Sequence, residues 1–207
     1  MMKDDYYDLG DFRRDVTTTS PQAQLWFDRG LAWAYCFNPE EAVRCFEKAL
    51  DYDPDCAMAH WGVAFGTGPN YNKAWRLFDA EDMQKAVTIG RGALERAREA
   101  VARNGTAFEK ALIAALGPRF PEQATRDPEE FDRLNRAYAD AMRVFYQQFS
   151  DDIDAAALAR LPAGTFAAVV TGGLVTASLW PVTVETDYYA ADVRLSPSWT
   201  DRSHIGT

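Results

Sequence analysis

Three aspartates, Asp51, Asp53 and Asp55, alternate along the chain like the first ligands of a calcium-binding loop. Such a loop also needs a glycine at its sixth position and a bidentate glutamate at its twelfth. Here those positions hold Cys56 and Gly62, which cannot take these roles. We therefore expect no metal site at these aspartates and interpret them as solvated acids at the end of a helix.

Histidine and cysteine, the residues on which zinc sites and many nucleophilic sites depend, are scarce. His60 and His204 are the only histidines, and the three cysteines, Cys36, Cys45 and Cys56, have no C-x-x-C spacing. A zinc site or a Ser-His-Asp arrangement therefore has almost no raw material. We expect His60 to be a packed ring and the cysteines to be reduced core thiols, and we expect no catalytic residues and no cofactor.

The charge balance excludes a further class of function. The 207 residues include 22 Lys and Arg against 31 Asp and Glu, a net charge of -9, which opposes nucleic-acid binding. The first 15 residues mix acids with bases and lack the apolar core of a signal peptide, so we expect a cytoplasmic protein. The uncharged stretch 161–184 is interrupted by glycines and Pro181, so no membrane span is expected.

A helical unit occurs more than once. Residues 41–57 align with residues 140–156, matching Ala42 with Ala141 and Phe46 with Phe145, and a weaker copy lies between them. Capping side chains precede prolines at three points, as at helix starts. Together with apolar residues three and four apart, these signals predict helices at 21–36, 39–51, 55–66, 82–103, 106–116 and 128–149. The predicted fold is all-α: three antiparallel helix pairs in a right-handed stack, with 152–160 starting a fourth.

Residues 23–56 resemble a tetratricopeptide repeat (TPR). The resemblance rests on the large, small, aromatic and proline positions of that family, which are held here by Trp26, Gly30, Trp33, Ala42, Phe46, Ala49 and Pro54. Small residues let paired helices approach, aromatics fill the remaining space, and the proline separates one pair from the next. Residues 16–158 also resemble a group of bacterial TPR proteins of unassigned function, which implies a protein-interaction solenoid and no enzyme activity. We divide the chain into an extension at 1–19, a repeat domain at 20–158 and a non-repeat tail at 159–207.

The resemblance also implies a binding surface. In TPR arrays the first helix of each pair builds a concave groove that receives a peptide of a partner protein. The groove-facing positions of this chain are apolar and aromatic: Phe27, Leu31, Tyr35, Trp61 and Phe65. The alternative is that these side chains pack against neighbouring helices.

The insertion 67–81 offers a rival function. Its Asn70, Tyr71 and Asn72 carry hydrogen-bonding groups that would suit a small polar ligand or an enzyme site, or that would contact a partner protein. Trp75 and Phe78, in the same insertion, favour packing.

The tail from residue 161 is not repeat sequence. If it leaves the array uncapped, Val144, Phe145 and Phe149 stay partly uncovered and the chain self-associates, with rapid proteolysis beyond about residue 160. Alternatively, the tail docks as an improvised cap, or the chain is a truncated form of a longer array.

Overall fold

The computed structural model describes residues 6–70, 73–160, 170–171 and 174–175. The chain divides into two compact units, residues 1–163 and residues 164–207, and each is treated by itself. In the second unit, β1 (Val170–Thr171) pairs antiparallel with β2 (Leu174–Val175). Two predictions, that the tail caps the array and that the chain is a truncated form of a longer array, concern residues outside the described ranges.

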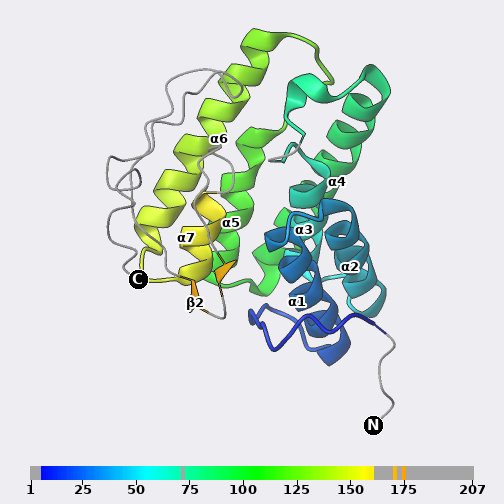
Figure 1. The fold of residues 1–207 in the computed structure, drawn as a ribbon, viewed down its shortest axis with the longest axis vertical. Helices are drawn as coiled ribbons and strands as arrows, with labels where there is room; N and C mark the ends of the chain where they lie inside the picture. Colours follow the sequence, from blue (N-terminus) through cyan, green and yellow to red (C-terminus); the bar gives the residue numbers. More distant parts are fainter. Residues whose placement is uncertain (1–5, 71–72, 161–169, 172–173, 176–207) are drawn as a thin grey trace, which may run out of the picture. The chain divides into compact units, whose positions relative to one another are not determined.

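The first unit is built of helices, as predicted (Figure 1). Its α-helices are α1 (Pro21–Tyr35), α2 (Pro39–Tyr52), α3 (Ala57–Thr67), α4 (Ala80–Asn104), α5 (Ala107–Leu116), α6 (Pro128–Gln148) and α7 (Ile153–Arg160), with short 3-10 helices η1 (Trp75–Leu77) and η2 (Gly117–Arg119). Pairing of α1 with α2, α3 with α4 and α5 with α6 confirms the three predicted helix pairs. The start of a fourth pair is confirmed by α7.

The helix starts follow the predicted capping residues. Ser20, Asn38 and Asp127 each accept a hydrogen bond from a backbone N–H in the first turn, and a proline occupies the first helical position behind each of them. Proline is suited to that position because its missing N–H has no intrahelical partner there. The helix starts are therefore fixed by local sequence.

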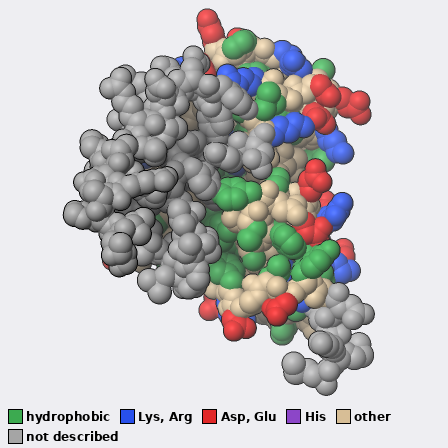
Figure 2. All heavy atoms as spheres, viewed as in Figure 1, with side chains coloured by type: hydrophobic (Ala, Val, Ile, Leu, Met, Phe, Trp, Pro, Cys, Tyr) green, Lys and Arg blue, Asp and Glu red, His purple; other side chains and the backbone are tan. Residues whose placement is uncertain are grey.

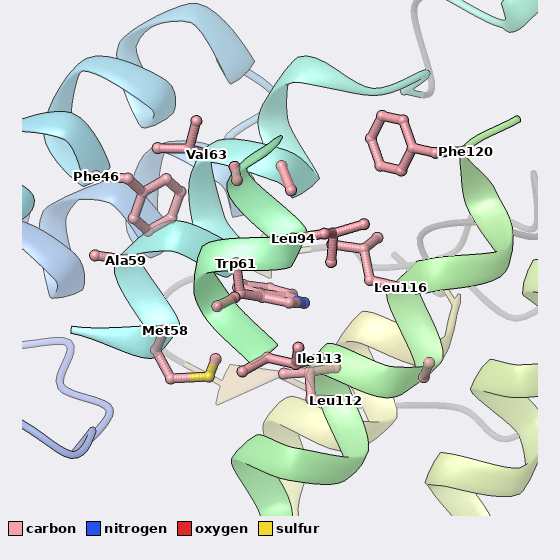
Figure 3. Close-up of a cluster of buried hydrophobic side chains, with 14 of the residues drawn as sticks. Phe46, Met58, Ala59, Trp61, Val63, Leu94, Leu112, Ile113, Leu116 and Phe120 are labelled. Carbon is pink, nitrogen blue, oxygen red and sulfur yellow. The ribbon is translucent and has the colours of Figure 1, made fainter. Parts of the chain in front are cut away.

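Phe46 of α2 fills the space between α1 and α3. A Cβ atom at Gly30 would lie 2.6 Å from the Phe46 ring, and one at Gly62 would lie 2.5 Å from it. Both glycines are thus required by the close approach of helices to this ring. Next to this contact, Trp61 of α3 packs with Leu112 and other side chains of the buried core (Figure 3).

Two expectations about exposure need correction. Phe145 is buried, because its ring packs 5.1 Å from that of Phe108 on α5, whereas Val144 is 64% exposed and Phe149 is partly buried. Cys45 and Cys56 are buried free thiols, but Cys36 is exposed, since it lies just beyond the end of α1. Self-association stays a prediction.

Among the described helices, no segment combines the length and the apolar character that a membrane crossing requires.

Candidate partner-binding surface

The expected aromatic groove is not open in this structure. Phe27, Leu31 and Trp61 are 0, 2 and 1% exposed, and Tyr35 and Phe65 are partly buried. The structure brings these residues together on α1 and α3, but it covers them. The burial of Phe27, Leu31 and Trp61 matches the alternative that they pack against neighbouring helices, and their contact with a partner stays a prediction.

The chain itself covers this side of the array. We call it the inner face, since it is built by the first helix of each pair, α1, α3 and α5, with α7 following them (Figure 1). Residues 12–18, which we call the clasp segment, have neither helix nor strand and lie against this face. The Tyr35 hydroxyl donates a 2.8 Å hydrogen bond to Asp154 Oδ1, which joins α1 to α7.

Side chains of α1 bind the backbone of the clasp segment. The Arg14 N–H donates to Asp28 Oδ1 at 3.0 Å, and the Val16 N–H donates to Gln24 Oε1 at 3.1 Å. Gln24 Nε2 donates to the Arg14 carbonyl at 2.7 Å. Burial raises the pKa of Asp28, although the hydrogen bonds from Arg14 and Gln24 oppose that shift. Side chains of α1 thus bind main-chain groups of the clasp segment. Every peptide carries such groups.

Glu109 of α5 holds the other end of the clasp segment. Its carboxylate accepts the Thr17 N–H at 2.7 Å and the Thr17 hydroxyl at 2.6 Å, and it also accepts the Thr106 N–H in a capping box. Burial alone would raise the pKa of Glu109, but the hydrogen bonds from Thr17 and Thr106 outweigh burial and lower it. A buried, ionised carboxylate is stable here because its oxygens are satisfied.

Arg14 enters a cage of acidic and aromatic side chains. Its Nη1 lies 2.6 Å from Asp152 Oδ2 and 3.1 Å from Asp154 Oδ2, and its guanidinium carbon lies 3.9 Å from the ring centre of Phe108. Burial lowers the pKa of Arg14, but the hydrogen bonds and charges of Asp152 and Asp154 outweigh burial and raise it. Asp152 Oδ1 also accepts from the first N–H groups of α7, so this carboxylate is held rigidly.

A second anchor holds the chain before the clasp segment. The Tyr6 hydroxyl donates to Glu41 Oε1 at 2.8 Å, accepts from Trp33 Nε1 at 2.8 Å and lies 3.0 Å from Cys45 Sγ. Burial, with the hydrogen bonds to Cys45 and Glu41, raises the pKa of Tyr6 far above its usual range. This anchor lies on α1 and α2, away from Glu109 and Asp154.

The clasp segment leaves a gap against the helices. A cavity of ≈ 30 Å³ lies there. Its lining includes Arg14, Val16, Phe27, Leu31, Trp61 and Leu158. Trp61 Nε1 is buried and has no hydrogen-bond partner among the described residues. The backbone of the clasp segment is therefore well hydrogen-bonded, but the segment does not fill the inner face completely.

Comparison with known proteins matches residues 23–56 to the tetratricopeptide repeat family model. Residues 23–56 therefore resemble a tetratricopeptide repeat. Repeats of this family support protein–protein interaction in general, and domains built from them are generally non-catalytic scaffolds. No curated protein and no solved structure matches the chain. The matched repeat comprises α1 and α2, so it supplies Gln24, Asp28 and Tyr35 to the inner face.

Sequence reasoning missed the residues that bind the clasp segment. The TPR pattern specifies apolar and small positions, and it says nothing of Gln24, Asp28 or Glu109. In the structure the polar side chains of Gln24 and Asp28 are buried on α1, but the sequence alone does not distinguish them from solvated side chains. Buried polar groups require partners, and here the partners come from outside the repeat.

The connection from α3 to α4, residues 68–79, is mainly packed. Trp75 and Phe78 are buried, as expected, and Trp75 Nε1 donates to the Arg119 carbonyl at 3.3 Å. The Asn70 side-chain oxygen accepts the Lys73 N–H, so it serves the turn itself. Tyr71 lies outside the described residues, as does Asn72.

The acids singled out for calcium have other partners. Asp51 pairs with Lys48, Asp55 pairs with Arg103, and Asp53 accepts from the Thr18 hydroxyl. Across the part of the chain that the structure describes, no three His, Cys, Asp or Glu side chains are grouped so that they could hold a metal ion. Figure 2 shows acidic and basic side chains interspersed on the visible face of the described residues.

His60 is a buried ring, as predicted, since its Nε2 lies 2.9 Å from the Pro54 carbonyl. The carbonyl is an acceptor, which assigns the ring proton to Nε2.

Proposed function

We propose that this chain is a protein-interaction module whose inner face binds a non-helical segment of a partner protein. The partner segment takes the place that the clasp segment occupies. The observation that carries this proposal is the set of hydrogen bonds between the side chains of Gln24, Asp28 and Glu109 and the backbone of residues 14–17. Side chains that bind main-chain groups accept many sequences, which suits a surface that exchanges one peptide for another.

The covered groove residues fit this proposal. Phe27, Leu31 and Trp61 line the cavity beneath the clasp segment, and Tyr35 contacts Phe12 of that segment edge to face. A partner segment in the same place would meet these side chains. Phe65 stacks on Trp61 and would support it rather than touch the partner. The rival function in the insertion is less well supported, since the Asn70 side-chain oxygen accepts the Lys73 N–H of its own turn.

The proposal is tested with a labelled peptide that has the sequence of residues 10–19. A free peptide competes poorly with a tethered segment, whose effective concentration is about millimolar. The full chain with Thr17→Pro loosens its own segment, because proline removes both the N–H and the hydroxyl that Glu109 binds. We expect saturable binding by fluorescence anisotropy and at least about tenfold weaker binding of a scrambled peptide.

Circular dichroism serves as the control for folding, since Thr17 lies outside every helix and the helical signal should be unchanged. Equal binding of the matched and scrambled peptides would contradict the proposal.

A further inference from the structure

The inner face carries a side-chain specificity in addition to its grip on main chain. Four carboxylates of this face lie near the clasp segment: Asp28, Glu109, Asp152 and Asp154. Two of these, Asp152 and Asp154, converge on one guanidinium, and Phe108 supplies an aromatic surface beneath it. A planar cation is the group that this combination fits, because it pairs with carboxylates and stacks on a ring at the same time.

The cage is preorganised by contacts that do not involve Arg14. The Tyr35 hydroxyl holds Asp154 Oδ1, and the N–H groups of Asp154 and Ala155 hold Asp152 Oδ1. The other oxygen of each carboxylate faces Arg14. The positions of both acids are therefore set by α1 and α7, and any arginine that replaces Arg14 meets the same geometry.

The contact is also accessible enough to exchange. The side chains of Arg14 and Asp152 are 21 and 26% exposed, so the ion pair lies at the edge of the inner face and not in the core. The cavity beside it, of ≈ 30 Å³, exceeds the roughly 10–15 Å³ that one water molecule needs. The cavity shows that the chain's own segment does not fill the inner face completely.

We infer that the partner segment bound by the inner face presents an arginine to Asp152, Asp154 and Phe108, and a hydroxyl residue three positions later to Glu109. This inference rests on the proposed function and gives its partner a chemistry. In the clasp segment, Arg14 and Thr17 have this spacing and stand in for the partner. The neighbouring Arg13 pairs with Asp15 in solvent, and its side chain is 63% exposed. The inner face therefore does not select the residue at this position.

Four labelled peptides with the sequence of residues 10–19 test the inference on the full chain carrying Thr17→Pro. They are the matched peptide and its Arg13→Ala, Arg14→Ala and Arg14→Lys forms. We expect Arg13→Ala to bind within about twofold of the matched peptide, and Arg14→Ala to bind about tenfold weaker or worse, since it loses charge-assisted hydrogen bonds. Arg14→Lys should also bind more weakly than the matched peptide, because an ammonium cannot stack as a planar group on Phe108.

The chain side of the contact is tested with Asp154→Asn and Phe108→Leu, two variants that alter different parts of the cage. Each variant should reduce the difference in affinity between the matched peptide and its Arg14→Ala form. If Asp154→Asn does not fold, Phe108→Leu supplies the test.

Equal binding of all four peptides overturns the arginine inference while the proposed function stands. Binding of none overturns both. A dimer of the intact chain that the matched peptide dissociates, seen by light scattering, assigns the face to the clasp segment of a second copy and overturns a distinct partner.

Discussion

Residues 12–18 and residues 68–79 both run across helices of the first unit, but opposite kinds of contact hold them. The clasp segment is held by hydrogen bonds to its backbone and by ion pairs at a partly exposed edge. The connection 68–79 is held by Trp75 and Phe78, which are buried and pack against each other. We expect the first kind of contact to open while the helices stay folded, whereas the second is part of the core.

This difference distinguishes a segment that suits binding, the clasp segment, from one that contributes to stability, the connection 68–79. The sequence suggested a functional loop here, because the insertion is long and carries Asn70, Tyr71 and Asn72, whereas Trp75 and Phe78 favoured packing. In the structure its described aromatics are core residues, and the less conspicuous polar segment lies on the inner face. The contacts of an irregular segment therefore indicate its role better than its length does. Buried side chains indicate a part of the core, and main-chain hydrogen bonds indicate a segment that suits exchange.

The largest expected effect comes from Trp75→Ala. The substitution removes a fully buried ring that packs on Phe120 at 5.9 Å and leaves a cavity, so the free energy of unfolding should fall by about 3–5 kcal/mol. Urea unfolding of the full chain, followed by circular dichroism, measures this loss.

Leu77→Ala is the matched control, since Leu77 lies in the same connection but is exposed and should cost less than about 0.5 kcal/mol. Similar losses for both variants would mean that the connection does not contribute to stability through its buried side chains.

Most of the fold could be predicted because local chemistry determines it. Ser20, Asn38 and Asp127 determine helix starts, and Gly30 allows the close contact with Phe46. These signals act within a helix or between neighbouring helices, where sequence spacing translates directly into space. The α7 helix was found by its similarity to the first repeat in the same way.

The covering of the inner face could not be predicted, because it depends on contacts distant in sequence. Arg14 meets Asp152 and Asp154 across about two-thirds of the chain, and Thr17 meets Glu109 across nearly half. None of these residues is one of the apolar and small positions that define the repeat. An acid on a helical array has no sequence feature that distinguishes a solvated side chain from one that binds a distant segment.

An intermediate effect is expected from Glu109→Gln, which tests the clasp segment. An amide has one acceptor oxygen, so it cannot serve Thr17 and Thr106 as the carboxylate does, and a buried donor loses its partner. The free energy of unfolding should fall by about 1–3 kcal/mol at pH 7. Hydrogen exchange at the Thr17 amide should accelerate by more than the exchange of the helix cores.

Glu99→Gln, at an exposed position on α4, provides the control and should leave both measurements unchanged. Uniform acceleration across all helices in Glu109→Gln would show that the clasp segment is as integral to the core as Trp75, and the comparison would fail.

The smallest effect is the pH dependence of that same contact. The hydrogen bonds from Thr17 and Thr106, outweighing burial, place the pKa of Glu109 below its ordinary value of 4.5. A carboxyl group whose pKa is lowered on folding stabilises the protein above the unfolded-state pKa, and this contribution disappears as the pH falls through the folded-state pKa. The difference in unfolding free energy between the native chain and Glu109→Gln should therefore be constant from pH 7 to about pH 5.5 and shrink below about pH 4.5.

Taking the difference between these two chains is essential because Asp28 titrates with the opposite sign. Burial raises the pKa of Asp28, so its protonation favours the folded state as the pH falls, and the two contributions partly cancel in the native chain alone. Asp28 is present in both chains, so subtraction leaves the contribution of Glu109. Urea midpoints at several pH values supply the measurement. A difference that grows on acidification would mean that the clasp segment binds the protonated form of Glu109, and the ionised contact with Thr17 would have to be abandoned.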